Sequence, residues 1–430
     1  MKKVLIISYY WPPAGGGGVQ RWLKMSKYLP EQGWKPVIYT PENGEAPVID
    51  ESLLDEIHSD VEIIKHPIWE PYKLYKFFTG KKKNQKVYSG FINDGKTSWT
   101  QNLSVFIRGN LFIPDARKFW IKPSIKFLSK YLKENPVDCI ISTGPPHSMH
   151  MIAHGIKKKF DIPWIADFRD PWTNIDFYDQ LKLTKYGDRK HRRMEASVLK
   201  LATKIITVTP SWAKDFIGLS GRDDIGIITN GFDPADFEGR NTTLDKKFSI
   251  CHIGSMNKDR NPHVLWKVLQ EKITDQKFAE NLIIRLIGQV DHSIMASIKE
   301  HGLESFVDHL SFVPHSEVID HIMSSYILLL PVNDTPNSMG VVPGKLFEYI
   351  GAQRPIIGIG PLEGDSSSIL KESGAGKMIA YEDAKKMDSL ISQHWTNFQS
   401  QKEWSNSNNY DSYSRKSLAM EYSKLLENLA

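Results

Sequence analysis

The sequence predicts an α/β protein with two parallel β-sheets, each covered by helices on both faces. Short apolar runs alternate with segments of helical periodicity along almost the whole chain. The pattern restarts near Lys246, where a new strand-like run begins after the exit turn of the first half. The chain has 430 residues, a length that suits two domains of about 150–250 residues each.

The first half has a series of apolar runs that we expect to be buried strands. The run Val4–Ser8 is too short for the core of a signal peptide, so we interpret it as the first strand. Helices are expected near residues 19–28, 124–133, 148–158 and 188–201. The expected strands are KVLIIS, KPVIYT, VEIIKH, VDCIIS, PWIADF, KIITVT and IGIITNGFD. We therefore assign residues 1–245 to a first Rossmann-like domain.

The second half repeats the pattern in residues 246–403. Its expected strands are KFSICHIGS, NLIIRLIG, DHLSFVP, YILLLPV, RPIIGIG and GKMIAY, with a helix from Pro262 onward. Residues 404–430 are expected to end in an amphipathic helix that packs back on the first domain; capping its own domain is the alternative. Its apolar stripe is formed by Leu418, Met420, Tyr422, Leu425 and Leu426.

The composition is that of a globular protein, with 40% hydrophobic and 24% charged residues. The net charge of +5 suits an anionic ligand or an anionic membrane surface, and no basic stripe suggests nucleic acid. Cys139 and Cys251 lie in strand-like runs, which predicts buried thiols in a reducing compartment. No run reaches the ~18–20 apolar residues of a membrane span. We expect a cytoplasmic protein that can be peripheral at the inner face of the cytoplasmic membrane.

A glycine-rich loop, YYWPPAGGGGVQR, follows the first expected strand. Glycines let backbone amides approach a ligand closely, and the following helix N-terminus favours an anion. Gly16, Gly17 and Gly18 are therefore candidates for binding an anionic ligand. The loop lacks the Gly-Lys-Ser/Thr of a phosphate-binding P-loop and the spacing of a dinucleotide fingerprint. A turn without a ligand is the alternative.

Two further segments follow strands of the first half. His147 lies in STGPPHS after VDCIIS, and Asp167, Arg169 and Asp170 lie in IADFRDPW. Parallel strands end at the same sheet edge, where open α/β sheets bind ligands, so we expect these four candidate catalytic residues to lie together. The alternatives are a structural histidine and an ion pair that fixes the loop.

In the second half, the segment GSMNKDRNP places Gly254 at a strand end, followed by Lys258 and Arg260. Asn261 and Pro262 are expected as the N-cap and first residue of a helix. Two cations beside a helix N-terminus suit a diphosphate, whereas a solvated basic turn is the alternative.

The segment NSMGVVPGKLFEYIGAQRPII is the most specific signal in the chain. Lys345 and Glu348 are one turn apart on an expected helix. If Leu346, Phe347 and Ile350 pack on the sheet, Glu348 faces a ligand, and its carboxylate can accept two hydrogen bonds from vicinal hydroxyls. Lys345 can reach a phosphate as a point charge.

Taken in order, these motifs, together with IPDARKFW and ITNGFD, resemble those of bacterial glycosyltransferase family 4-like proteins of the GT-B fold, over nearly the whole chain. The resemblance implies two Rossmann-like domains with an interdomain cleft. It also implies a retaining, metal-independent transfer from a nucleoside-diphosphate sugar, without a cofactor. Glu348 would bind the ribose, the Lys258–Arg260 loop the diphosphate, and the first domain the acceptor.

The sequence departs from the family pattern at two positions. The first glutamate of the family's Glu-x7-Glu falls on Gly340, and Ser255 stands where a basic residue usually follows the glycine. Asp334 or Asn337 could substitute, or Gly340 and Val341 could contribute backbone amides. These departures keep two alternatives open: a GT-B sugar-nucleotide epimerase, and a non-catalytic GT-B scaffold with a degenerate donor site.

We also expect a role in cell-surface polysaccharide synthesis, with a hydroxyl of a glycan or lipid-linked acceptor as the nucleophile, because the segment 68–86 would suit a lipid-linked acceptor. Residues 68–86 interleave aromatic residues with lysines, among them Lys81–Lys83. Such a segment could rest on an anionic membrane surface, and a solvated insertion is the alternative.

Overall fold

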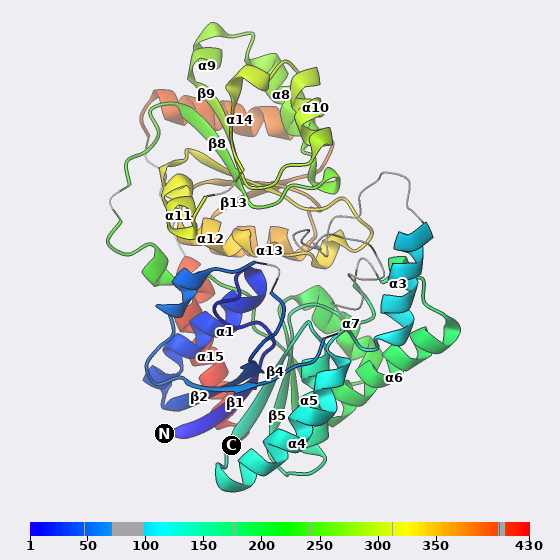
Figure 1. The fold of residues 1–430 in the computed structure, drawn as a ribbon. Coiled ribbons are helices and arrows are strands. Elements are labelled where there is room, and N and C mark those ends of the chain that lie inside the picture. Colours follow the sequence, from blue (N-terminus) through cyan, green and yellow to red (C-terminus); the bar gives the residue numbers. More distant parts are fainter. Residues whose placement is uncertain are drawn as a thin grey trace. The chain divides into compact units, whose positions relative to one another are not determined.

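The computed structural model describes residues 1–46, 48–70, 99–175, 178–240, 242–311, 313–402, 404 and 409–430 (Figure 1). The chain forms two compact units. The first comprises Met1–Thr229 together with Leu418–Ala430, and the second comprises Asn230–Ser417. Within the described residues, the helices and strands of each unit follow the alternation expected from the sequence.

The first unit contains, in its described residues, a seven-stranded parallel sheet of order β3-β2-β1-β4-β5-β6-β7. The order reverses between β1 and β4, which makes their carboxyl ends the expected ligand position. The strands are β1 (Lys2–Ile7), β2 (Trp34–Pro41), β3 (Glu62–His66), β4 (Cys139–Gly144), β5 (Trp164–Phe168), β6 (Lys204–Thr207) and β7 (Ile225–Ile227).

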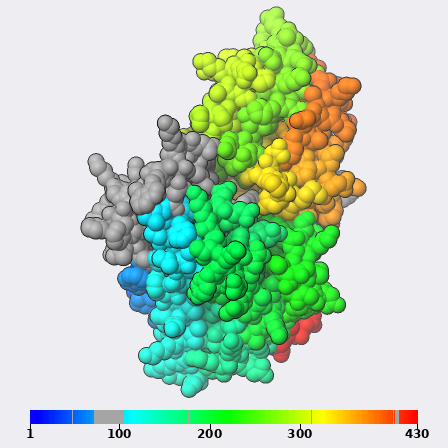
Figure 2. All heavy atoms as spheres, turned by 90° about the vertical axis from the view of Figure 1, so that its right-hand side faces the viewer, coloured from blue at the N-terminus to red at the C-terminus, as the bar shows by residue number. Residues whose placement is uncertain are grey.

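Helices cover both faces of this sheet because its strand residues are apolar on both sides. Leu5 and Ile7 of β1 pack in one core cluster with α4, α5, α6 and α7, whereas Val4 and Ile6 pack with α1 and α15 on the other face. The α4–α7 face is the cyan-to-green surface in Figure 2. The helices are α1 (Gly17–Tyr28), α3 (Trp99–Leu111), α4 (Lys118–Glu134), α5 (Ser148–Lys157), α6 (Lys185–Leu201), α7 (Pro210–Ser220) and α15 (Arg415–Glu427).

The second unit repeats this topology with a six-stranded parallel sheet among its described residues, of order β10-β9-β8-β11-β12-β13. Its order reverses between β8 and β11. The strands are β8 (Phe248–Ile253), β9 (Leu282–Ile287), β10 (Val307–Leu310), β11 (Ile327–Pro331), β12 (Ile356–Ile359) and β13 (Gly376–Ile379).

The helices of the second unit also form two layers. Phe248 and Ile250 pack with α8, α9, α10 and α14, and Cys251 and Ile253 pack with α11, α12 and α13. These helices are α8 (His263–Lys272), α9 (Gln276–Asn281), α10 (His292–Glu300), α11 (His315–Ser324), α12 (Lys345–Gly351), α13 (Asp365–Ser373) and α14 (Ala384–Gln399). The predicted class of two Rossmann-like α/β/α domains is confirmed.

The division between the units falls after Thr229 and not at the predicted 245/246 boundary. The reason is that residues 230–245 pack on the second unit. Phe232 donates its N–H to the Tyr413 carbonyl at 3.1 Å, and Arg240 forms an ion pair with Asp320. At the C-terminus, the residues that group with the first unit begin at Leu418 rather than at 404, and Leu418, Tyr422 and Leu426 of α15 are buried in its core.

No helix among the described residues is both long and apolar enough to cross a membrane. Of the segment 68–86 that was predicted to contact a membrane, residues 71–86 lie outside the described part of the chain, including the basic run Lys81–Lys83. Cys139 and Cys251 are free and buried, as expected from their strand-like runs.

Candidate functional site

The second unit contains a cavity of about 270 Å³ at the carboxyl ends of its strands. Lys345 and Glu348, both predicted as binding residues, lie in its wall, as does Gly254. The lining comes from the ends of β8 and β9, the segment after β10, and helices α11 and α12. Its residues are Ile253, Gly254, Ile287, Gly288, Ser311, Val313, Val318, Lys345 and Glu348. A concave site with an apolar wall and two charged groups is typical of a small-molecule binding site.

Two neighbouring strands end at this cavity in glycines with left-handed backbone. Gly254 has φ +80° and Gly288 has φ +116°, a conformation that costs glycine little. A Cβ on Gly288 would lie 2.7 Å from the Gly254 carbonyl oxygen, and one on Gly254 would lie 3.4 Å from Nζ of Lys345. Both glycines therefore keep the backbone close together and leave Lys345 accessible from the cavity.

Lys345 is the first residue of α12, and its Nζ lies 3.0 Å from Nε2 of His252 in β8. Burial, reinforced by the nearby Arg260 cation, lowers the pKa of Lys345 well below its usual value, although Glu348 opposes the shift. Among the described residues Lys345 forms no ion pair. A bound anion would supply the missing negative charge.

Glu348 occupies the cavity wall because Leu346, Phe347 and Ile350 of the same helix are buried in the core, as predicted. Its carboxylate makes no hydrogen bond or ion pair to any described residue. Burial raises the pKa of Glu348, whereas His315 and Lys345 lower it. A half-buried carboxylate with open acceptor positions is suited to bind hydroxyl donors.

Arg260 is fixed at the topological switch point of the second sheet. It lies in the turn Lys258–Arg260, where its Nε donates to Oδ1 of Asn333 after β11 and its Nη1 donates to the Ser255 carbonyl at 3.1 Å. The guanidinium interacts electrostatically with Lys345, so the two predicted cations lie in one electrostatic environment. Lys258 is exposed in the same turn.

The helix after this turn begins one residue later than expected. Pro262 is the N-cap of α8 and His263 its first residue. Asn261 does not cap the helix, because its Oδ1 accepts a hydrogen bond from the Trp266 indole at 2.8 Å. The predicted capping role of Asn261 is therefore wrong.

Gly340 and Val341 do not line the cavity. Their N–H groups donate to the carbonyls of Asn337 and Ser338 at 3.2 Å each, inside the turn Ser338–Gly340. The Val341 carbonyl also accepts from the Ser366 hydroxyl at 2.8 Å. Because the turn uses both amides, the structure gives no support to their predicted role as amide donors to a ligand.

In the first unit, the glycine-rich loop leads into α1 at the carboxyl end of β1. Gly16 is the N-cap of α1 with φ +91°, and Gly17 and Gly18 are the first two residues of that helix. A Cβ on Gly16 or Gly17 would meet nothing within 4 Å, whereas one on Gly18 would contact Tyr10 at 3.1 Å. Two of the three glycines therefore leave open space in front of the helix.

Arg169 connects the two loops at the switch point of the first sheet. Its Nη1 donates to the Gly18 carbonyl at 3.0 Å, and its Nη2 donates to the Pro145 carbonyl. Burial lowers the pKa of Arg169, and Asp170 opposes this shift. The structure thus brings the glycine-rich loop and the STGPPHS segment together, with Arg169 positioning both. Asp170 is half-buried beside it.

His147 is 8% exposed and is the N-cap of α5. Its ring stacks on Trp172 at 4.7 Å with an interplanar angle of 1°. Burial, together with the neighbouring His150 and Arg169, lowers the pKa of His147 well below its usual value. A neutral imidazole is the form that can accept a proton, which is consistent with a catalytic base but equally with a packed core side chain.

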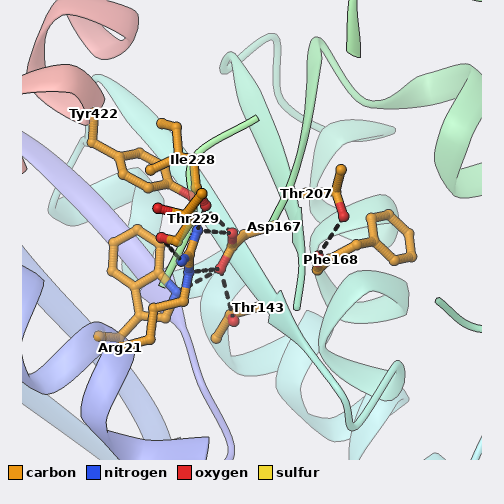
Figure 3. A network of polar contacts seen from close by, with 9 residues as sticks. Arg21, Thr143, Asp167, Phe168, Thr207, Ile228, Thr229 and Tyr422 are labelled. Atoms are coloured by element: carbon orange, nitrogen blue, oxygen red, sulfur yellow. Dashed lines mark hydrogen bonds and ion pairs between the residues drawn. The ribbon is translucent and has the colours of Figure 1, made fainter. Parts of the chain in front are cut away.

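The structure gives Asp167 a structural role in place of the predicted catalytic one (Figure 3). Its side chain is fully buried inside β5 and accepts five hydrogen bonds. Arg21 donates through Nη2 at 2.9 Å and through Nε at 3.1 Å. The remaining donors are the Trp22 indole at 2.8 Å, the Thr143 hydroxyl at 3.0 Å and the Tyr422 hydroxyl at 2.7 Å. No acceptor capacity is left for a substrate.

Electrostatics agree with this role. Burial opposes ionisation of Asp167, but the Arg21 guanidinium and the hydrogen bonds outweigh it and hold the pKa of the carboxyl below its usual value. Arg21 also donates to the carbonyls of Thr229 at 2.7 Å and Ile228 at 2.9 Å. This network therefore connects Ile228 and Thr229, at the end of the first unit's main segment, with α15. Its members are Arg21, Trp22, Thr143, Asp167 and Tyr422.

Several residues in or beside the second unit's cavity were missed in the sequence, among them His252, which does not line the cavity but contacts Lys345. His252 lies inside an apolar strand, where a histidine is usually structural, and Gly288 closes a strand in the same way as Gly254. The glycine after NLIIRLI was the available signal, because two adjacent strands ending in glycine indicate close backbone approach. Val313 and Val318 have no signal beyond hydrophobicity.

Comparison with solved structures identifies the fold. Anabaena HepE, solved in complex with UDP-glucose, aligns with a TM-score of 0.61 and 13% identity over 100% of both chains. Sucrose-phosphate synthase from Thermosynechococcus elongatus aligns with a TM-score of 0.60 and 12% identity over 100% of this chain and 99% of its own. TarM from S. aureus, solved with UDP, aligns with a TM-score of 0.56 and 13% identity over 99% of this chain and 100% of its own. The chain has the GT-B fold of these proteins.

Comparison of the sequence with protein-family models and with curated proteins gives no match.

Proposed function

We propose that this chain is a glycosyltransferase that takes a sugar from a nucleoside-diphosphate sugar, and that the nucleotide binds in the cavity of the second unit. One observation carries the proposal: Lys345 and Glu348 line the same cavity, and neither has an ion-pair partner among the described residues. Their charges match the two polar parts of a nucleoside diphosphate, whose ribose offers vicinal hydroxyls and whose pyrophosphate offers negative charge.

In this assignment Glu348 accepts hydrogen bonds from the ribose hydroxyls, and the apolar wall formed by Val313 and Val318 faces the base. Lys345 and Arg260 face the diphosphate. Because both cations are held in place before the reaction, they stabilise the negative charge that develops as the leaving diphosphate departs. Two structural neighbours were solved in complex with UDP-glucose and with UDP, which supports a nucleotide ligand.

The finer parts of this proposal rest on the family resemblance for the reaction, and on the aromatic and basic sequence of residues 68–86 for the acceptor. They are a retaining reaction without a metal or cofactor, and a glycan or lipid-linked hydroxyl as acceptor in cell-surface polysaccharide synthesis. In a front-face retaining reaction the leaving phosphate can accept the proton of the attacking hydroxyl, so a strong protein base is not required. Chelation with EDTA should leave the transfer rate unchanged if no metal takes part.

Calorimetry with UDP, GDP and ADP tests the nucleotide site. Glu348→Gln removes the charge but keeps the size of the side chain. It should weaken nucleotide binding about 10–100-fold, because one of the two acceptor oxygens becomes an NH2 donor and the remaining oxygen is no longer charged. Glu363→Gln is the matched control, since Glu363 is an exposed carboxylate of the same unit. Equal affinity of wild type and Glu348→Gln would remove the ribose assignment.

Incubation with donor sugars alone separates the proposed activity from its alternatives. An epimerase converts the donor without an acceptor, whereas a glycosyltransferase transfers the sugar only when a hydroxyl acceptor is present, apart from slow hydrolysis. A scaffold with a degenerate site binds the nucleotides weakly or not at all and transfers no sugar.

A further inference from the structure

His252 is the penultimate residue of β8, and its side chain is 1% exposed. Its Nδ1 lies 3.0 Å from the carbonyl oxygen of Leu329 in β11. A carbonyl can only accept a hydrogen bond, so Nδ1 carries the proton. The neutral imidazole then presents the lone pair of Nε2 toward Nζ of Lys345.

Nε2 of His252 lies 3.0 Å from Nζ of Lys345. Lys345 therefore donates to a neutral ring at a position where a buried lysine usually meets a carboxylate. Burial and the adjacent Lys345 lower the pKa of His252 well below its usual value, and the Leu329 and Ser255 backbone groups oppose the shift only in part. The ring thus stays an acceptor at neutral pH.

Among the described residues, two further charged groups act on this pair, Arg260 and Glu348. Arg260 faces both side chains from the turn Lys258–Arg260, and Glu348 faces Lys345 from the next turn of α12. Arg260 disfavours a second cation nearby, whereas Glu348 favours it. A carboxylate in place of His252 would neutralise Lys345 before any ligand arrived. An imidazole fixes the position of Nζ without supplying a counter-charge.

We propose that His252 is a positioning residue that directs Nζ of Lys345 toward the diphosphate of a bound nucleotide, and that nucleotide binding adds a proton to the His252–Lys345 pair. The inference rests on the proposed function, because it needs an anion at this end of the cavity. Without a ligand, burial and Arg260 disfavour the charged form of Lys345. A diphosphate beside Nζ favours that form, so the proton arrives with the ligand.

Calorimetry of UDP and GDP binding in phosphate and Tris buffers measures this proton uptake, because the two buffers differ in ionisation enthalpy. We expect the wild type to take up part of a proton on binding at pH values well above the second pKa of a phosphate, which is about 6. Its affinity should fall as the pH is raised further, because the free protein then loses the proton of Lys345. Lys345→Met, which leaves His252 in place, should abolish both the uptake and the alkaline fall.

His252→Leu removes the acceptor, and His252→Gln can restore it through its Oε1 atom. His252→Leu should weaken nucleotide binding about tenfold and move the alkaline fall to lower pH by about one unit, and His252→Gln should restore most of both. A purely structural histidine would lower the melting temperature without moving the pH profile.

The outcomes separate the two claims. If the wild type binds none of UDP, GDP and ADP, the proposed function fails and this inference with it. If the wild type binds but gives the same heat in both buffers, or if His252→Leu leaves the pH profile unchanged, the proposed function stands and the role of His252 is refuted.

Discussion

Asp167→Asn is the sharpest test of the network in Figure 3, because it keeps the shape of the side chain and removes its charge. The asparagine offers one acceptor oxygen in place of two. The NH2 group of the asparagine fits best at the position of Oδ1, because the Tyr422 hydroxyl can rotate and accept a hydrogen bond from it. Nη2 of Arg21 then faces an N–H group, and the guanidinium stays buried without its counter-charge.

The structure sets the size of the effect. Arg21 and Asp167 are both fully buried, and breaking a buried pair by removing one charge costs about 3–5 kcal/mol. For a domain of about 150–250 residues each kcal/mol lowers the melting temperature by about 2–4 °C, so the expected fall is about 6–20 °C. Tyr422→Phe removes one hydrogen bond to a charged acceptor and should cost about 1.5–3 kcal/mol.

Differential scanning calorimetry measures the fall, with Asp170→Asn as the control. Asp170 is the neighbouring carboxylate, and it is only half-buried. Nucleotide affinity, measured below the melting transition, should change by less than about twofold, because the candidate nucleotide cavity lies in the other unit. An Asp167→Asn variant that melts like the wild type but has lost sugar transfer would refute the structural role and restore the catalytic one.

Three further predictions concern other positions. Gly288→Ala should destabilise the protein by about 1–3 kcal/mol, because the new Cβ would lie 2.7 Å from a backbone oxygen. It should also weaken nucleotide binding in calorimetry. Gly218→Ala is the control and should show neither loss, because its Cβ would meet nothing within 4 Å. Arg169→Met should cost about 3–5 kcal/mol in urea unfolding by leaving two loop carbonyls without their charged donor, and an unchanged midpoint would exclude the positioning role. Burial lowers the pKa of His150 from 6.5 to about 3. Its contribution to stability should thus fall by about 1.4 kcal/mol per pH unit below pH 6.5, and urea midpoints of the wild type and His150→Leu should converge as the pH is lowered.

The strands could be predicted from the sequence because parallel strands covered on both faces are continuous apolar runs. Helix ends were less certain. The helix expected to begin near Ser124 begins at Lys118. A proline is usually found at the start of a helix, but Pro123 lies inside α4, so it does not mark the helix start here. The boundary near 245 failed because the segment after Thr229 has no glycine-rich or proline-rich composition to mark the change of unit, and only its packing on the second unit assigns it.

The position of Asp167 in the sequence indicates a buried structural carboxylate rather than a catalytic one. Asp167 lies inside the run PWIADF rather than after it, and it alternates with Ala166 and Phe168, so it shares a face with Ile165. Ile165 packs in the cluster that contains α1 and α15. A carboxylate at an interior strand position must have buried partners. What the sequence could not supply was the identity of Arg21 and Tyr422, which lie 146 and 255 residues away.

The two switch points also differ in how their charges are satisfied, and this difference supports the proposed position of the ligand in the second unit. In the first unit Arg21 is paired with Asp167, and Arg169 donates to two backbone carbonyls, so the protein itself supplies the partners of these charges. In the second unit Lys345 meets a neutral histidine, and Glu348 has no partner among the described residues. Burying a charge without a counter-charge costs stability, and a fold retains such a cost where a ligand supplies the counter-charge. The unsatisfied pair at the end of β8 is therefore stronger support for a ligand site than any motif of the first unit, although the glycine-rich loop is the more conspicuous in the sequence.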